Sequence, residues 1–121
     1  MTVTATNVHL KTRRALANVI GIYSNYTQYV NARDTIAQLD IPYAKCIAIV
    51  EFACSIDAIS WAEHSECIQT VRDIHEVQGS LRKCARLPAS ERAKHLAHLQ
   101  SHSVAATAAR VASLKSILRS A

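Results

Sequence analysis

Apolar residues recur every three or four positions along most of the chain, a spacing typical of amphipathic helices. The first such stripe predicts a helix from about Val8 to Leu39. Its apolar positions are Leu16, Val19, Ile20, Tyr23, Tyr26, Val30 and Ala37. The opposite face is rich in hydrogen-bonding groups and is basic near its N-terminal end. It carries Lys11, Arg14, Asn18, Gly21, Asn25 and Gln28.

The pair Ile41-Pro42 predicts the start of a second helix near Pro42. The residue before a proline disfavours the helical conformation, whereas proline itself suits the first helical turn. The residues that follow, as far as Ile59, are apolar nearly all round. We therefore expect this helix to be the most buried one, with a solvent edge formed by Lys45, Glu51 and Ser55.

A break is expected somewhere in residues 58–65, where Ser60 followed by Glu63 fits a capping box. Without it, residues 42–86 would form one helix about 65 Å long at 1.5 Å per residue, and three long helices with a continuous central one would form a dimer. With the break, Gly79 ends or loosens a third helix. The buried stripe of that third helix is Ile68, Val71, Ile74, Val77 and Leu81.

The segment Leu87–Glu91 opens the last helix, with a proline in the first turn and an acid near the positive end of the helix dipole. This helix is predicted to run to about Leu118. Its buried stripe is Leu96, Leu99, Val104, Val111, Leu114 and Leu118.

These elements predict an all-α protein, a four-helix up-down bundle in which the first and last helices are neighbours. The chain has only two glycines and two prolines, too few for the many turns of a sheet protein. Its 121 residues suit one helical domain spanning residues 1–121. Within that domain we expect residues 1–7 and 119–121 to be flexible.

The cysteines indicate a reducing compartment. Cys46, Cys54, Cys67 and Cys84 show no paired short spacing, and no apolar signal segment precedes them. We expect an intracellular, cytoplasmic protein. The threonine-rich N-terminus, without an acid before Asp34, loosely resembles a mitochondrial presequence, so that location is the minor alternative. No membrane span is expected, because acids interrupt the most apolar stretch.

Charge is distributed unevenly along the chain. All nine acidic residues lie between Asp34 and Glu91, so both ends carry only positive charge. If the first and last helices are neighbours, the two basic ends merge into one face that suits a polyanion.

A column of histidines is the clearest candidate for chemistry. His95, His98 and His102 share one exposed side of the last helix. Imidazoles in such a column bind a metal, gain charge near pH 6 to 7 beside an anion, or are simply solvated. With no carboxylate or thiol in the column, we predict no metal and no cofactor, and expect the histidines to tune polyanion binding.

Other combinations predict structural roles. His64 and Cys67 stand one helical turn apart, but buried thiols explain them better than a zinc site. Asp57 and Glu63 are the acids expected to be partly buried, paired with residues such as Arg72 or Lys83. Nothing fixes a nucleophile beside a base, so we do not expect an enzyme.

The leading hypothesis is a nucleic-acid-binding protein that does not read sequence and prefers structured RNA to DNA. A helical surface can lie across the wide minor groove of A-form RNA and contact phosphates and 2′-hydroxyls. The predicted contact residues are Lys11, Arg13, Arg14, Asn18, Asn25, Gln28, Arg92, Lys94, His95, His98, His102, Arg110 and Arg119.

The alternative is a non-enzymatic interaction protein, such as an adaptor, an inhibitor, or a subunit of an assembly or virus-derived particle. Here the acidic middle of the chain or an exposed apolar strip would make the contact. Its partner would be an acidic protein or, in a homodimer, a second copy. Under this hypothesis the basic ends are incidental.

Overall fold

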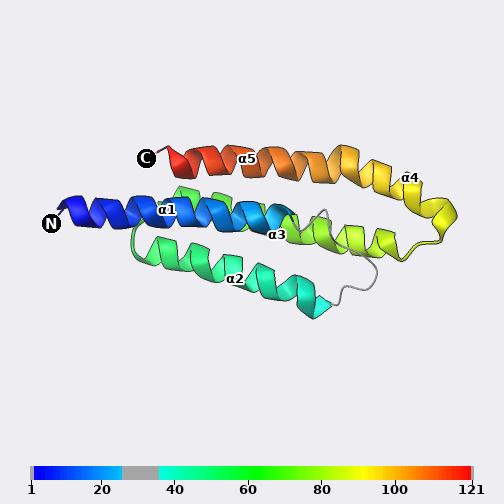
Figure 1. Ribbon diagram of the computed structural model, residues 1–121, viewed down its shortest axis with the longest axis horizontal. Helices are drawn as coiled ribbons and strands as arrows, with labels where there is room; N and C mark the ends of the chain where they lie inside the picture. Colours follow the sequence, from blue (N-terminus) through cyan, green and yellow to red (C-terminus); the bar gives the residue numbers. More distant parts are fainter. Residues whose placement is uncertain (1, 26–35, 121) are drawn as a thin grey trace.

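The computed structural model describes residues 2–25 and 36–120, and the described chain is an all-α bundle (Figure 1). Its helices are α1 (Thr2–Asn25), α2 (Ile36–Ser55), α3 (Trp61–Ala85), α4 (Ala89–Leu99) and α5 (Ala105–Arg119). A single π-helical turn, η2 (Gln100–Val104), joins α4 to α5, so these three elements form one long rod. No described helix is both long enough and apolar enough to cross a membrane.

The four rods alternate in direction along the long axis of the molecule (Figure 1). Helix α1 packs against α2 and α5, and α3 also packs against α2 and α5. The first and last helices are therefore neighbours, as predicted. The core between them contains fully buried aliphatic side chains from all four rods, among them Leu16, Val50, Ile74 and Leu118. Burying each such side chain stabilises the fold by about 1.5–3 kcal/mol.

The predicted break between the second and third helices is confirmed, at residues 56–60. Asp57 adopts the left-handed conformation, with φ of 60°. The Ala58 N–H donates to the Ala53 carbonyl over 2.9 Å, and the Asp57 N–H donates to the Cys54 carbonyl over 3.0 Å. This pair of bonds is the Schellman motif that ends a helix. Residues 42–86 thus form two helices, not one.

The capping box at the start of α3 is confirmed as well. The Ser60 hydroxyl accepts from the Glu63 N–H over 3.1 Å, and the Glu63 carboxylate accepts from the Ser60 N–H over 2.9 Å. Both bonds satisfy N–H groups that have no partner within the helix.

The predicted boundary between the first two helices is wrong. Helix α1 already begins at Thr2, and α2 begins at Ile36, so Pro42 lies inside α2. An interior proline removes one backbone hydrogen bond. The helix continues because the turns after the proline are held against the core, with Cys46 and Val50 buried. Tyr26 and Val30, predicted in the first apolar stripe, lie outside the described residues.

Gly79 was expected to end or loosen the third helix, but it lies well inside α3. A glycine inside a helix lowers its stability without having to terminate it. The buried residues on either side, Val77 and Leu81, keep this part of α3 on the core.

Helix α2 is less buried than its composition predicts. One of its faces points to solvent, with Ile41 56% and Phe52 57% exposed. The physical reason is its place in the bundle, because α2 packs mainly against α1 and α3, and no other described helix covers its outer side. The predicted solvent edge of Lys45, Glu51 and Ser55 is exposed, but Ala44 and Ala48 are exposed with it.

The long C-terminal rod is buried along one half only. In α5, Val111 and Leu114 reach the core, whereas no residue of α4 or η2 is buried. Leu96, Leu99 and Val104, predicted to be buried, are half-buried. Helix α4 packs on the end of α3, and the turn between them projects beyond the ends of α1 and α2 (Figure 1).

Candidate nucleic-acid interface

Where the first and last helices pack together, two cations of α5 lie against α1. A Cβ added at Gly21 would lie 3.1 Å from Lys115 Nζ, so the bare glycine leaves room for the lysine side chain to cross α1. One turn further along α5, Arg119 Nη2 donates to Asn18 Oδ1 over 2.8 Å. Gly21, predicted on the polar face of the first helix, and Asn18, a predicted contact residue, therefore position Lys115 and Arg119.

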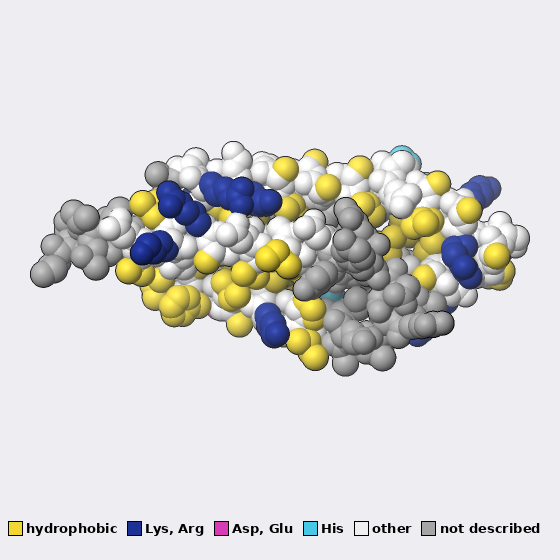
Figure 2. Space-filling view, in the orientation of Figure 1, with side chains coloured by type: hydrophobic (Ala, Val, Ile, Leu, Met, Phe, Trp, Pro, Cys, Tyr) yellow, Lys and Arg dark blue, Asp and Glu magenta, His cyan; other side chains and the backbone are white. Residues whose placement is uncertain are grey.

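Lys11 and Arg14 are exposed on the neighbouring turns of α1. Figure 2 shows Lys and Arg side chains gathered over α1 and α5 near the two chain ends. No acidic side chain of the described residues is visible on that face. We call the group formed by Lys11, Arg14, Lys115 and Arg119 the α1–α5 basic face.

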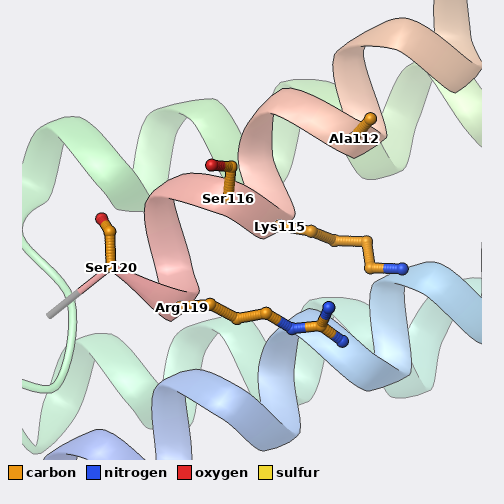
Figure 3. Close-up of a pocket in the computed structure, with 5 residues that line it drawn as sticks. All are labelled: Ala112, Lys115, Ser116, Arg119 and Ser120. Atoms are coloured by element: carbon orange, nitrogen blue, oxygen red, sulfur yellow. The ribbon is translucent and has the colours of Figure 1, made fainter.

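The surface of α5 at this face has an open depression, whose lining residues are drawn in Figure 3. Lys115 and Arg119 extend side by side toward α1, and Ser116 and Ser120 present hydroxyls from the neighbouring positions of α5. Its lining residues are Ala112, Lys115, Ser116, Arg119 and Ser120. Cations and hydroxyls on an open surface suit phosphate oxygens, which position a nucleic acid without reading its bases.

Arg13, a predicted contact residue, is instead tied into the bundle. Its guanidinium forms two hydrogen bonds with the Glu63 carboxylate and donates to the carbonyls of Ala58, Ile117 and Leu118. All five of its N–H groups thus have partners, and its side chain is only 12% exposed. The partner expected for Glu63 was Arg72 or Lys83, so that pairing was wrong.

Arg110, another predicted contact, also faces carboxylates. Its Nη1 donates to Asp73 over 2.6 Å and its Nη2 to Glu66 over 3.4 Å. Both acids belong to α3, so the ion pairs of Arg110 link α3 to α5. These carboxylates neutralise the charge of Arg110, so its attraction for a polyanion is weaker.

The predicted histidine column lies on the other half of the rod. His95, His98 and His102 are exposed on α4 and η2, and the rings of His98 and His102 have centroids 4.5 Å apart. From His98 to Lys115 the rod rises about 25 Å at 1.5 Å per residue. The histidines therefore do not join the α1–α5 basic face. Among the described residues, no group of three or more His, Cys, Asp or Glu is arranged to hold a metal ion.

A second basic cluster lies at the tip of the α3–α4 hairpin. Lys83 and Arg86 close α3, and Arg92 and Lys94 follow in α4; all four are exposed. Figure 2 shows Lys and Arg side chains at this end as well. Lys83 and Arg86 fall between Asp34 and Glu91, the stretch that contains all nine acids, so the charge pattern along the chain did not reveal this hairpin-tip cluster. A narrower window would have found it, since Glu91 is the only acid in residues 82–98.

Of the three predicted polar contact residues, Asn18, Asn25 and Gln28, the structure describes the first two. Asn18 joins α1 to α5 through its bond to Arg119, and Asn25 is exposed as the last residue of α1. Gln28 lies outside the described residues.

The buried cysteines, His64 and Tyr23 lie in surroundings that suit structural roles. Burial raises the pKa of Cys46 to about 11 and that of Cys67 to about 12, so both stay protonated thiols and poor nucleophiles at neutral pH. His64 Nε2 lies 2.8 Å from the Glu51 carboxylate, whereas Cys67 is buried in the core. Burial also raises the pKa of Tyr23, whose hydroxyl lies 3.3 Å from His75 Nδ1.

Comparison of the chain with protein-family models, with curated proteins and with solved structures finds no match. A function therefore has to be inferred from the residues themselves. Among those described, the α1–α5 basic face and the hairpin-tip cluster are the groupings of exposed charge that a ligand could use.

Proposed function

We propose that the protein binds nucleic acid without reading its sequence, through the α1–α5 basic face, and that structured RNA is the preferred ligand. One observation carries the proposal: cations from opposite ends of the sequence meet on a face where no described acidic side chain is visible. Arg13 and Arg110 are left out of the contact set because carboxylates already engage them.

Binding of this kind is driven by phosphate neutralisation. Each phosphate contact lowers the slope of log K against log salt by about 0.9 for a duplex. The four cations of the face therefore predict a slope of roughly −3 to −4. Two of them are already oriented, Lys115 across Gly21 and Arg119 by Asn18, so less side-chain freedom is lost on binding.

The preference for RNA follows from the shape and chemistry of the face. A helical rod lies readily across the shallow minor groove of an A-form duplex, where 2′-hydroxyls accompany the phosphates. Asn18, Ser116 and Ser120 present hydrogen-bonding groups beside the cations of the α1–α5 basic face. Such groups meet 2′-hydroxyls that DNA lacks.

The test is fluorescence anisotropy with a labelled 20-base-pair RNA duplex over a range of salt. The variant Lys115→Glu/Arg119→Glu should bind more than tenfold more weakly than the wild type, with a salt slope shallower by about 2. The matched control is Lys45→Glu/Arg72→Glu, which changes net charge equally at exposed positions on α2 and α3.

The control should retain most of the affinity. Equal losses in both variants would mean that net charge alone governs binding, and no binding by the wild type at low salt would refute the proposal. A DNA duplex of the same sequence tests the preference for RNA, and an unrelated RNA duplex tests the absence of sequence reading.

A further inference from the structure

A strip of exposed apolar side chains follows the border between α1 and α2. Val8 and Ile22 on α1 are 49% and 56% exposed, and Ile41 and Phe52 on α2 are exposed to a similar degree. Val8 and Ile22 are 14 residues apart and Ile41 and Phe52 are 11 apart, so each pair shares one side of its helix. Figure 2 shows hydrophobic side chains along α2 and its border with α1. We call this strip the α1–α2 groove.

A small pocket lies within the groove. Its volume is about 130 Å³, and it is lined by Val19, Ile22, Tyr23, Pro42, Lys45 and Cys46. Pockets that enclose drug-sized ligands measure about 300–1,000 Å³. The pocket is therefore too small for such a ligand and fits a single anchoring side chain, the usual centre of a protein interface.

The charge beside this pocket is positive. Among the described residues that line the pocket, Lys45 is the charged one and is exposed, and Lys11 of the basic face is exposed on α1. The two described acids of α2, Asp40 and Glu51, are engaged with His75 and His64 of α3, on the other side of the helix. An occupant with carboxylates along its flank would complement this surface.

We infer that the α1–α2 groove docks an amphipathic helix of a partner protein, with an apolar side chain in the pocket and an acidic flank beside Lys45. Helices commonly bind grooves between two helices through anchors at i, i+3 or i+4, and i+7. A second copy of this chain fits less well, because a symmetric contact would bring the Lys45 side chains of both copies into one interface. The inference does not depend on RNA binding.

The probe is a fluorescein-labelled 18-residue helical peptide with leucines at i, i+3, i+4 and i+7 and glutamates along one flank. Wild-type protein should bind it and should bind a sequence-scrambled version much more weakly. Ile22→Ser and Phe52→Ser should each weaken binding by about tenfold, as expected for anchor contacts. Both positions are more than half exposed, and circular dichroism checks that each variant is folded.

A charge swap makes the test specific. Lys45→Glu should weaken binding of the glutamate peptide and strengthen binding of a version with lysines in place of the glutamates. Trp61→Ser, which removes a side chain 77% exposed on α3, is the control and should change neither affinity. Lys115→Glu/Arg119→Glu should also leave peptide binding intact, which separates this inference from RNA binding.

Several outcomes would overturn the inference. One is no binding of the glutamate peptide, or equal binding of the scrambled peptide. Another is a homodimer in solution that Ile22→Ser dissociates, which would assign the groove to a second copy. A third is binding to phosphatidylserine vesicles that Ile22→Ser and Phe52→Ser abolish, which would assign it to a membrane surface.

Discussion

Arg13 of α1 and Glu63 of α3 face each other in a two-pronged ion pair, with nitrogen–oxygen distances of 2.8 and 2.7 Å. The same guanidinium reaches the Leu118 and Ile117 carbonyls, which lie at the end of α5 where helical partners are missing. It also donates to Ala58 in the turn after α2. One side chain thus ties together all four rods at this end of the bundle.

The first prediction separates Arg13 from its neighbour Arg14. Arg13→Ala should lower the free energy of unfolding by about 2–4 kcal/mol, since Glu63 loses its ion-pair partner and three carbonyls each lose a hydrogen bond. Arg14→Ala, at an exposed position, should change it by less than about 0.5 kcal/mol. Urea denaturation measures both, and similar values for the two variants would contradict the structural role of Arg13.

The second prediction concerns stability in acid. The hydrogen bonds from Arg13 lower the pKa of Glu63 from 4.5 to about 2. A carboxyl group with a lowered pKa stabilises the fold above its unfolded value and loses that contribution as the pH falls through its folded value. Stability should therefore drop between about pH 5 and pH 2, by about 2 kcal/mol after allowance for solvent screening.

Glu63→Gln removes the titrating group and serves as the control for that experiment. Its stability at pH 7 should be lower than that of the wild type, but it should lose less between pH 5 and pH 2. Denaturation midpoints at several pH values decide the matter. If the wild type and Glu63→Gln lost stability in parallel over that range, another carboxyl group would be responsible.

The third prediction concerns the turn between α2 and α3. Asp57 holds the left-handed conformation, which costs an ordinary residue energy but suits glycine. Asp57→Gly should therefore raise the free energy of unfolding by about 0.5–1 kcal/mol, measured by urea denaturation. Asp57→Ala keeps the Cβ and serves as the control. It should not stabilise the protein, and a stabilising effect of alanine would contradict the proposed origin of the strain.

The bundle could be predicted because its signals are local. Apolar periodicity located the helices, and the capping box of Ser60 and Glu63 requires only residues three apart. The position of Pro42 inside α2 could not be predicted, since local preference favours a helix start and only packing against α1 and α3 outweighs it. The exposed outer face of α2 depends likewise on how many neighbours the helix has.

The basic face was only partly predictable, for a related reason. Its net charge is visible in the sequence. Whether each arginine is exposed or paired with an acid, however, depends on residues that are distant in the sequence. Arg13 and Arg14 look alike in sequence, and only the fold brings Glu63, 50 positions away, to one of them. Arg110 forms an ion pair with Asp73, which is likewise distant in the sequence.

The last prediction concerns the length of RNA that the protein prefers. Lys94 of the hairpin-tip cluster and Lys115 of the basic face are 21 residues apart on one rod, about 30 Å at 1.5 Å per residue. Only a duplex that spans this distance can contact both clusters at once, which adds phosphate contacts and steepens the salt dependence. Under the proposed function, a 24-base-pair RNA duplex should therefore bind more tightly than a 10-base-pair one, by more than its larger number of overlapping binding positions explains.

Lys83→Glu/Arg86→Glu should abolish that advantage and leave the affinity for the short duplex nearly unchanged, as measured by fluorescence anisotropy. Equal loss for both lengths would mean that the hairpin tip acts only through net charge.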